Sequence, residues 1–243
     1  MAYLEIQNLT ISEDTTSLVH LLKEHKKSIT INSSLALIGQ SGSGKSLSLK
    51  SILGMTPNNL KANFEYESDF ELTKENLGFI PQNPFTSLSP MTKINKQFFD
   101  NNGKYFKKER INELFEMVGL SSELQYRFPV ELSGGQLQRI VIAIALSTNP
   151  KLLLLDEPTT ALDDESKKNI LYLILNLQKK LGFIFIFVSH DIESIKNLCK
   201  DIAIIKDGFI CDYGETNTVL SNPNHPYTNE LINSNFENRK FRV

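Results

Sequence analysis

The stretch GQSGSGKS, from Gly39 to Ser46, limits what this chain can fold into more than any other part of its sequence. It fits the pattern G-x-x-x-x-G-K-[ST] and lies directly between the apolar run SLALIG and the helical pattern GKSLSLKSILGM. A glycine-rich turn between a buried strand and a helix N-terminus presents backbone N–H groups to an anion such as phosphate. We therefore predict that Lys45 reaches the β- and γ-phosphates of a nucleotide and that the Ser46 hydroxyl binds Mg²⁺. An ordinary Gly/Ser loop is the alternative, and the strand and helix on either side argue against it.

Three short apolar runs predict a parallel sheet. They span 34–39, 151–156 and 183–190, and none shows the period-two alternation of a half-buried strand. Helical patterns follow the first two runs, and the second pattern, SKKNILYLILNLQKKLG, has Gly182 as its expected C-cap. Strands that alternate with helices predict an α/β fold with right-handed crossovers.

Two other segments predict antiparallel strands. The region before Ser34 begins with the alternating run MAYLEIQNLTI. Nearer the C-terminus, IAIIKDGFICDYG has the form of a hairpin that turns at Asp207 and Gly208. We therefore expect an N-terminal antiparallel β subdomain beside the parallel core.

The middle of the chain predicts an inserted helical subdomain. Between 83 and 135 the composition becomes polar, and KKERINELFEMVGL has the pattern of an amphipathic helix that ends near Gly119. The 243 residues then form one domain, in which 1–82 and 136–243 make the α/β core and the antiparallel β subdomain.

Charge and cysteine content exclude several function classes. The net charge of -2 and the pI of about 6.1 give no global reason to expect nucleic acid as a partner. Cys199 and Cys211 lack metal-ligand spacing, so we expect free thiols in a reducing compartment. The N-terminus has no pattern of a secretion signal, and the longest apolar runs are far shorter than the roughly 20 residues that cross a bilayer. We expect the chain itself to be soluble and cytoplasmic, with any membrane role exercised through a partner.

Acidic and polar side chains follow the predicted parallel strands. Asp156 and Glu157 end the run LLLLDE, at the strand end where α/β sheets bind ligands. Beside a phosphate loop, Asp156 is a candidate ligand of Mg²⁺, mostly through water, and Glu157 is a candidate to polarise an attacking water. A solvated turn is the alternative. His190 ends FIFIFVSH and Gln82 follows LGFIP, and each of these two residues, taken alone, is as readily structural.

A second glycine pair precedes another helix. In LSGGQLQR, Ser133 is placed to cap a helix that begins near Gly135, and the small residues leave its N–H groups open to a phosphate. One nucleotide does not need two such cradles if the first already encloses its phosphates. The second cradle is therefore predicted to serve a nucleotide held by another copy.

The motifs, taken in their order along the chain, resemble those of the ATP-binding cassette (ABC) ATPases. They are the phosphate loop, Gln82, LSGGQ, LLLLDEP, TTALD and His190, and they span nearly the whole chain. The resemblance implies a P-loop, RecA-like core, ATP and Mg²⁺ as ligands, and ATPase activity. It also implies two subunits that dimerise head to tail, with each ATP between the phosphate loop of one subunit and the LSGGQ of the other. Asp163, at the end of TTALD, would lie in the loop that crosses this interface.

The family pattern assigns roles to individual residues. Glu157 and His190 would serve hydrolysis and contact with the γ-phosphate, and Gln82 would sense the metal and water and link to the helical subdomain. Ser46, Gln82 and Asp156 would hold Mg²⁺. The residues expected to contact nucleotide, bound to this chain or to its partner, are Gly39, Gln40, Ser41, Gly42, Ser43, Gly44, Lys45, Ser46, Leu47, Ser133, Gly134, Gly135, Gln136 and Asp163.

Two further segments resemble the ATPases of dipeptide, oligopeptide and nickel importers. They are PQNPFTSLSPMTKI, which contains Gln82, and NHPYTNELINS in the tail. The short chain and a tail without a cysteine cluster favour the nickel type, that is, import of nickel or a metal chelate, with short peptides as the second candidate. Because the tail follows the last core strand, we expect the tail motif to lie away from the nucleotide and Tyr227 to hold the C-terminal segment.

The importer resemblance also implies partners. These are an identical or sister ATPase subunit, two membrane permease subunits and, indirectly, an extracytoplasmic solute-binding protein. Nucleic acid is not among them. The expected location is peripheral, at the cytoplasmic face of the inner membrane.

Adenine recognition departs from the family pattern. ABC ATPases usually stack adenine on an aromatic residue near the end of the first strand pair, and LTISEDTTSLVHLLKEHKKS contains no Phe, Tyr or Trp. His20 or His25 would have to substitute, since Tyr3 comes too early. We therefore expect weak selectivity between bases.

Two other function classes stay as alternatives. A soluble ABC ATPase that acts on DNA or ribosomes usually carries a long coiled-coil insertion or a second cassette, and this sequence shows neither pattern. A nucleotide-binding regulator without turnover is disfavoured by Glu157, because non-hydrolysing cassettes commonly lose that residue.

Overall fold

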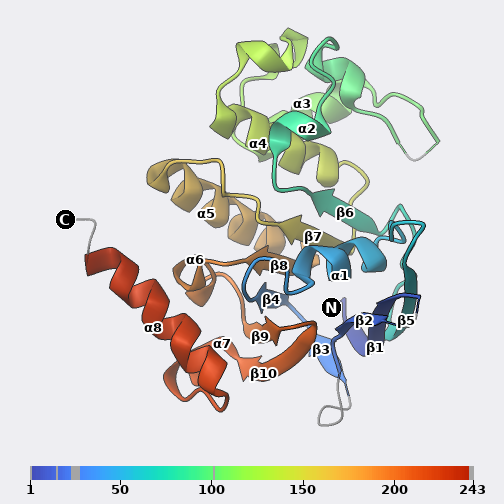
Figure 1. Cartoon of the computed structure of the whole chain (residues 1–243). Coiled ribbons are helices and arrows are strands. Elements are labelled where there is room, and N and C mark those ends of the chain that lie inside the picture. The colour runs from blue at the N-terminus through green and yellow to red at the C-terminus, as the bar shows by residue number, and fades with distance from the viewer. Residues whose placement is uncertain (1, 15, 23–27, 101, 241–243) are drawn as a thin grey trace. The chain divides into compact units, whose positions relative to one another are not determined.

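The computed structural model describes residues 2–14, 16–22, 28–100 and 102–240, and the chain divides into two units. The first unit comprises Met1–Leu72 and Ile184–Val243, and the second comprises Thr73–Phe183. Figure 1 labels the helices and strands of both units.

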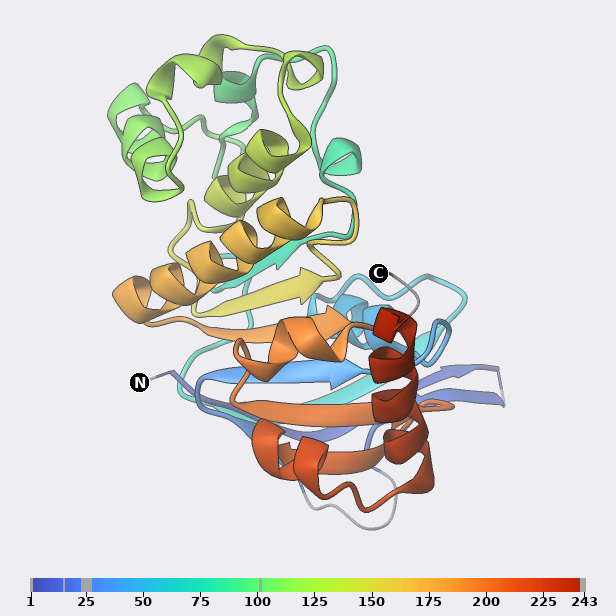
Figure 2. The ribbon, with the colours of Figure 1, turned by 90° about the vertical axis from the view of Figure 1, so that its left-hand side faces the viewer.

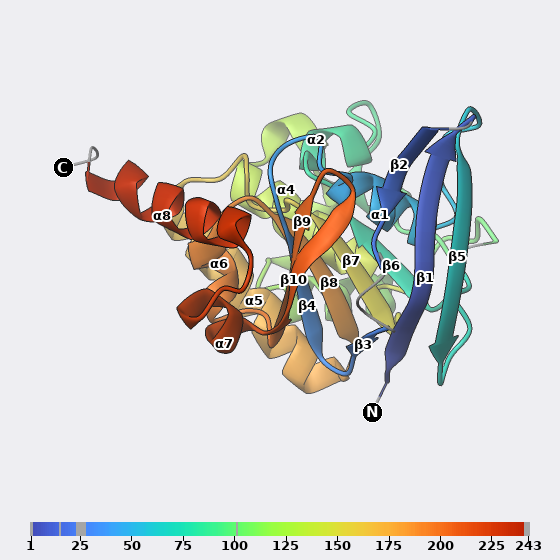
Figure 3. The ribbon, with the colours of Figure 1, turned by 60° about the horizontal axis from the view of Figure 1, so that its bottom comes forward.

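An antiparallel sheet forms the N-terminal part of the first unit (Figure 3). Its strands are β1 (Leu4–Glu13), β2 (Thr16–His20), β3 (Ile29–Ile31) and β5 (Lys61–Ser68). β1 pairs antiparallel with each of the other three. The sequence predicted antiparallel strands before Ser34, and β5 lies outside the region of that prediction. Leu4 and Ile6 are buried in the first half of β1, and Leu9 and Ile11 in the second half. The change from even to odd positions follows from a register shift against β5 between Ile6 and Asn8, because a bulge moves the following side chains to the opposite face.

A group of parallel strands and a hairpin form the other layer of the first unit. The strands are β4 (Ser34–Ile38), β8 (Ile184–Ser189), β9 (Asp201–Lys206) and β10 (Phe209–Glu215). β4 lies between β8 and β9 and is parallel to both. Every residue of β4 and β8 is buried, which explains why their sequences do not alternate. β10 returns antiparallel to β9 through Asp207 and Gly208, whose φ angles of 49° and 82° confirm the predicted hairpin turn.

The helices of the first unit follow its strands. They are α1 (Lys45–Ile52), α6 (Ile192–Lys196), α7 (Thr216–Ser221) and α8 (Pro226–Lys240). α1 begins directly after the loop that leaves β4. α8 contacts β10 and α6, and Figure 2 shows it lying across the sheet end toward which β4 points. The start of α8 and the start of α1 therefore lie at the same end of the parallel strands.

Among the described residues, the second unit has two parallel strands, four α-helices and three 3₁₀ helices. The strands are β6 (Leu77–Ile80) and β7 (Leu152–Asp156), which pair from Leu77 with Leu152 to Ile80 with Leu155. The helical elements are α2 (Pro84–Ser87), η1 (Ile94–Gln97), α3 (Lys108–Met117), η2 (Ser122–Tyr126), η3 (Pro129–Glu131), α4 (Gly134–Ala145) and α5 (Asp164–Leu181). The predicted boundaries of a helical subdomain, 83 and 135, stay a prediction.

The predicted helices of the second unit are confirmed together with their ends. α5 stops at Gly182, whose φ of 75° is the left-handed conformation of a C-cap glycine. α3 ends at Met117, just before Gly119. Its buried face carries Leu114 and Phe115, and the Phe115 ring lies 5.9 Å from the ring of Phe98. This aromatic pair belongs to the apolar core that the amphipathic pattern of α3 requires.

The cysteines and helices bear on two expectations drawn from composition. Cys199 is buried and Cys211 is half-buried, and both are free thiols, as predicted. Burial raises the pKa of the Cys199 thiol well above its ordinary value, so this thiol stays protonated. Within the described ranges, no helix combines the length and the apolar character that spanning a membrane requires.

Candidate functional site

The phosphate loop, 39–44, connects β4 to α1 within the first unit. Gly44 is the N-cap of α1 and has a φ of 99°, and a Cβ atom at this position would lie 2.6 Å from Cγ2 of Val19. A Cβ atom on Gly39 would lie 2.2 Å from the carbonyl oxygen of Ile205 in β9. Both glycines are therefore required by the close packing of the loop against β2 and β9, before any ligand is considered.

Lys45 folds back over this loop from the first position of α1. Its Nζ donates hydrogen bonds to the carbonyl oxygens of Gly39 and Gln40, each at 2.8 Å, and the side chain is only 5% exposed. Two carbonyl dipoles compensate the buried ammonium group, which a buried charge requires. The cation thus lies inside a turn of backbone at a helix N-terminus, an arrangement suited to binding phosphate.

The buried hydroxyl of Ser43 shows whether the loop fits a phosphate. The backbone N–H of Ser43 donates to the Gln40 carbonyl at 3.2 Å, but the Ser43 Oγ is buried and has no hydrogen-bond partner among the residues that the structure describes. A buried hydroxyl without a partner is costly, and such groups are rare in native structures. A ligand oxygen would satisfy it. The loop residues therefore fit a nucleotide phosphate, while Ser46, on the exposed side of the first turn of α1, is accessible to a metal ion.

The tail motif contacts this loop. The Tyr227 hydroxyl accepts a hydrogen bond from the backbone N–H of Gln40 at 3.0 Å. The expectation that the tail motif lies away from the predicted nucleotide site is therefore wrong. β10 runs back from the carboxyl end of β9, and the chain then returns through α7 and residues 222–225. The start of α8 binds Asp212 in β10, which pairs with Ile204 beside Ile38 at the carboxyl end of β4. The sequence identified Tyr227 as part of a motif, but its contact with Gln40 depends on the order of the strands, which the motif does not reveal.

His190 lies at the same edge of the first unit as the phosphate loop. It follows β8, whose last residue Ser189 pairs with Ile38 at the end of β4. The Ser189 hydroxyl accepts the Asp191 N–H at 3.0 Å and so fixes the turn that carries the exposed His190. Its contact with a γ-phosphate stays a prediction.

The predicted acidic residues lie at the end of β7 in the second unit. Asp156 is buried, and Glu157 has a φ of 45°, an unusual left-handed conformation for a residue with a side chain. The carboxylate of Glu157 accepts hydrogen bonds from Nε2 of Gln82 at 3.4 Å and from Oγ1 of Thr160 at 3.1 Å. Parallel pairing of β6 with β7 brings Gln82 and Glu157 together at one strand end. Thr160 was not predicted, although it lies within the TTALD motif.

The LSGGQ segment forms a capped helix N-terminus in the second unit. Ser133 Oγ accepts the Gln136 N–H at 3.3 Å, and Gln136 Oε1 accepts the Ser133 N–H at 3.0 Å, which is a complete capping box. A Cβ atom on Gly134 or Gly135 would meet its nearest neighbour, Leu162 or Ser166, at an ordinary 3.8 Å. Neither glycine has a positive φ. No described neighbour in this unit therefore requires glycine at either position.

Asp163 caps α5. Its Oδ1 accepts the Ser166 N–H at 2.9 Å, and this hydrogen bond lowers the pKa of the Asp163 carboxyl below its ordinary value. The residue thus has a structural task that the sequence reading did not assign. Its predicted place in a dimer interface is a separate matter and stays a prediction.

Three residues were considered for stacking on adenine, and the structure describes the positions of two of them, His20 and Tyr3. The His20 ring lies 6.3 Å from the ring of Phe209, tilted by 41°, and its backbone N–H donates to Gly208. Tyr3 hydrogen-bonds to Asp69 and Glu67 at the other end of β1. His25 lies outside the described residues.

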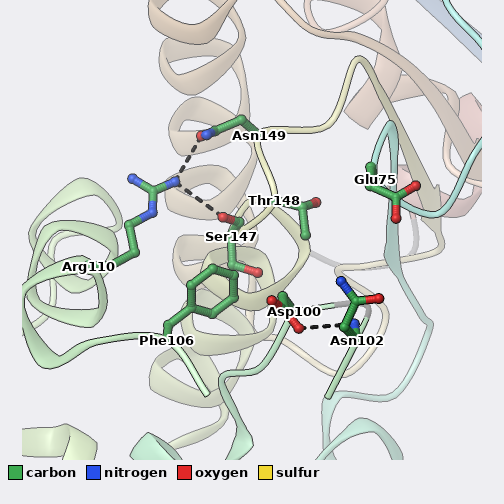
Figure 4. A pocket seen from close by; sticks show the side chains of 8 residues that line it. All are labelled: Glu75, Asp100, Asn102, Phe106, Arg110, Ser147, Thr148 and Asn149. Atoms are coloured by element: carbon green, nitrogen blue, oxygen red, sulfur yellow. Dashed lines mark hydrogen bonds between the residues drawn. The ribbon is translucent and has the colours of Figure 1, made fainter. Parts of the chain in front are cut away.

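A separate hollow of about 440 Å³ lies in the second unit (Figure 4). Its lining residues are Glu75, Asp100, Asn102, Phe106, Arg110, Ser147, Thr148 and Asn149. The Arg110 guanidinium donates to the Ser147 carbonyl and to Oδ1 of Asn149, and Asp100 accepts the Asn102 N–H. None of the predicted site residues is among these lining residues.

Comparison with solved structures defines the class of fold. The chain superimposes on CbiO1 of Clostridium perfringens, part of the ABC transporter complex CbiONQ, with a TM-score of 0.75, 24% sequence identity and coverage of 90% of each chain. This likeness confirms the predicted fold class, an ABC ATPase core with parallel strands, an N-terminal antiparallel β subdomain and helices.

Sequence comparisons show the family. A model of the ABC transporter family matches residues 22–160. The oligopeptide transport ATP-binding protein OppD of Bacillus subtilis is 36% identical over 95% of this chain and 71% of its own length. The metal-staphylopine import system ATP-binding protein CntD of Staphylococcus aureus is 30% identical over 96% of this chain and 93% of its own length. The chain therefore belongs to the ABC transporter family, and it is related to the ATP-binding subunits of such transporters.

Proposed function

We propose that this chain is the ATP-binding and ATP-hydrolysing subunit of an importer and drives the passage of a solute through membrane permease partners. The phosphate loop carries the proposal. Its Lys45 ammonium is buried between two loop carbonyls, and its Ser43 hydroxyl is buried without a hydrogen-bond partner in the described part of the chain. Both features suit a bound phosphate chain. The names of the relatives, which include transporters of oligopeptides, dipeptides and metal-staphylopine, support the transport role.

The phosphate loop and the first turn of α1 are the proposed phosphate-binding residues. The set is Gly39, Gln40, Ser41, Gly42, Ser43, Gly44, Lys45, Ser46 and Leu47. Backbone N–H groups and the helix N-terminus donate to phosphate oxygens, and Lys45 neutralises part of their charge. Ser46, Gln82 and Asp156 are the proposed holders of Mg²⁺, which when bound neutralises charge on the phosphates.

Glu157 is the proposed catalytic carboxylate. The amide of Gln82 and the hydroxyl of Thr160 hold its carboxylate in one orientation. A carboxylate fixed in this way can accept a hydrogen bond from water and align that water for attack on the γ-phosphorus. We assign contact with the γ-phosphate to His190, which follows β8.

The LSGGQ segment is proposed to act on ATP held by a second subunit, identical or sister, in a head-to-tail dimer. Glycines near a helix start cost helix stability, and neither Gly134 nor Gly135 is demanded by its neighbours in this unit. A phosphate of ATP bound to the partner subunit would approach the backbone closely at these positions, which would explain why both residues are glycine. Ser133, Gln136 and, in its interface loop, Asp163 complete the proposed contacts.

The proposed solute is a metal chelate, nickel included, or a short peptide. Relatives named for both kinds of solute match this chain at similar identities, 30% for CntD and 36% for OppD. The remaining partners are two permease subunits and, indirectly, an extracytoplasmic solute-binding protein. The ATPase would then sit at the cytoplasmic face of the membrane, bound to the permeases.

Phosphate release by the assembled transporter tests this function. The wild-type chain, with its partner subunits, is expected to bind and hydrolyse ATP. The Glu157→Gln variant is expected to keep ATP affinity and to lose turnover by about 10²-fold or more, because it loses the group that activates water. Near-normal hydrolysis by this variant would contradict the role of Glu157. Absence of ATP binding by the wild-type chain would contradict the function itself, and binding without turnover would favour a regulator.

A further inference from the structure

We propose that Tyr227 is a positioning residue for the phosphate loop, because its hydroxyl fixes the peptide group whose carbonyl binds Lys45. This inference rests on the proposed function, since it concerns how the loop is held ready for ATP. It gives the NHPYT segment of the tail a task at the nucleotide site.

The peptide group between Gly39 and Gln40 is held from two sides. Its carbonyl oxygen accepts a hydrogen bond from Nζ of Lys45 at 2.8 Å, and its N–H donates to the Tyr227 hydroxyl at 3.0 Å. The carbonyl and the N–H of one planar peptide group point in opposite directions. Rotation of this group would therefore break both hydrogen bonds together, so the tyrosine hydroxyl indirectly fixes the acceptor of Lys45.

Tyr227 is itself held tightly. The residue is only 3% exposed, and Nζ of Lys206, at the end of β9, lies 4.9 Å from the centre of its ring. A cation over an aromatic face at this distance is an attractive contact. The backbone N–H of Tyr227 donates to Nδ1 of His225 at 3.1 Å. Burial raises the pKa of the Tyr227 phenol, so the hydroxyl stays neutral over the physiological range.

The start of α8 is anchored to the hairpin through a buried carboxylate. Oδ2 of Asp212, in β10, accepts the backbone N–H of His225 at 2.9 Å and the hydroxyl of Thr228 at 2.6 Å. Pro226 begins the helix, where a missing N–H has no cost. His225 and Thr228 thus bind Asp212, and Pro226 begins the helix. Together these residues fix the start of α8, from which the Tyr227 hydroxyl reaches the phosphate loop.

A purely structural role for Tyr227 makes a different prediction. If the residue only packed α8 against the strands, removing its hydroxyl would lower the stability of the chain without a selective effect on nucleotide. If it positions the loop, the Gly39–Gln40 peptide gains freedom and Lys45 loses a fixed acceptor. Affinity for ATP and for ADP would then fall together, because the proposed contacts of Lys45 include the β-phosphate, which both nucleotides carry. Turnover of bound ATP would change little, since the contacts described for Tyr227 are with Gln40, His225 and Lys206, and none of these is a proposed catalytic residue.

The Tyr227→Phe variant tests the role, because it keeps the ring and removes only the hydroxyl. We expect ATP and ADP binding to weaken about twofold to tenfold, the range that corresponds to one hydrogen bond, with KM raised by a similar factor and kcat nearly unchanged. Hydrogen exchange of the Gln40 amide, measured without nucleotide, is expected to become faster.

Tyr213→Phe is the matched control. Tyr213 is half-buried in β10, and its hydroxyl donates to the Thr30 carbonyl at 3.3 Å, away from the loop. This variant is expected to lose stability while keeping ATP affinity and the Gln40 exchange rate. Thr228→Val is a second test, because it keeps Tyr227 and removes one hydrogen bond to Asp212. It is expected to speed exchange at Gln40 and to weaken ATP binding.

The outcomes separate this inference from the proposed function. Equal ATP affinity and equal Gln40 exchange in the wild-type and Tyr227→Phe chains would overturn the positioning role. The same result for Thr228→Val would overturn it if Tyr227→Phe does not fold. An equal loss of affinity in Tyr213→Phe would also count against it, since the effect would then follow stability. Failure of the wild-type chain to bind ATP would contradict the proposed function instead.

Discussion

At the scale of single residues, the glycines of this chain divide into two kinds. Gly39 and Gly44 are required by close contacts with Ile205 and Val19 inside the first unit. Gly134 and Gly135 meet only ordinary neighbours and have no left-handed backbone. Glycines of the first kind are required for the packing of the phosphate loop. Glycines of the second kind are not required by their described neighbours, so their proposed role is a contact with a molecule outside this chain.

Replacing Gly135 with alanine tests the second kind. The new Cβ atom would lie 3.8 Å from Oγ of Ser166, so we expect unchanged or slightly higher stability and unchanged ATP affinity of the isolated chain. In the assembled transporter, the methyl group would stand between the helix N–H groups and the partner's phosphate. We expect turnover to fall at least about tenfold, the effect of roughly 1.4 kcal/mol on the barrier. Thermal unfolding checks the first expectation and phosphate release the second, and undiminished turnover would remove the proposed role of LSGGQ.

Base recognition gives a second residue-scale prediction. Aromatic stacking contributes roughly 1–3 kcal/mol per base in proteins that use it, and the sequence before the phosphate loop has no Phe, Tyr or Trp at the expected place. His20 lies beside Phe209. We expect GTP to compete with ATP within about fivefold, a difference below the stacking range. Competition binding measures this ratio, with His20→Ala as the control. A strong preference for ATP that His20→Ala abolishes would show that His20 takes part in recognising adenine.

At the scale of elements, the end of α5 offers a prediction that isolates backbone strain. Gly182 has a φ of 75°, and a Cβ atom there would have no neighbour within 4 Å. Gly182→Ala is therefore expected to lower the free energy of unfolding by about 1 kcal/mol through conformation alone. Gly182→Asn is expected to cost less, because asparagine tolerates this conformation better. Chemical denaturation of both variants checks the order, and equal stability of all three chains would contradict the C-cap assignment.

The same elements show what local sequence determines. Apolar runs without alternation predicted β4, β7 and β8 because strands buried on both faces need no polar side. Ser133 predicted the start of α4 and Gly182 predicted the end of α5, because capping depends on hydrogen bonds between residues close in the sequence. The hairpin at Asp207 and Gly208 followed from turn chemistry. These features depend on residues within a few positions of one another, so a single sequence contains the required information.

Contacts between distant segments were not accessible in this way. The hydrogen bond between Gln40 and Tyr227 joins residues that are 187 positions apart, and it depends on the order of β4, β9 and β10. The Gln82–Glu157 contact likewise depends on the pairing of β6 with β7. The motifs identified the participating residues, but strand order decides which of them meet. The sequence therefore identifies Tyr227 as part of a motif but does not show that this tyrosine reaches the phosphate loop.

At the scale of the whole molecule, the proposed activity needs more than this chain. The LSGGQ glycines and the phosphate loop are assigned to two different nucleotides in a dimer, so a single subunit would bind ATP without completing the proposed site. Selectivity for the solute would lie in the permease and solute-binding partners, because this chain contributes ATP binding and turnover. The consequence is that transport should depend on Lys45 regardless of which solute is carried.

Uptake by cells that lack the gene tests this dependence and ranks the solutes. Lys45→Ala is expected to lose ATP binding, because it removes the one cation that two loop carbonyls hold in the phosphate loop. We expect deletion to abolish uptake of labelled nickel or its chelate, the wild-type gene to restore it, and the Lys45→Ala gene to fail. Unchanged metal uptake with lost uptake of labelled peptides would reverse the ranking in favour of peptides. Restoration by Lys45→Ala would contradict ATP-driven transport by this subunit, and unchanged uptake of both solutes after deletion would contradict its assignment to either importer.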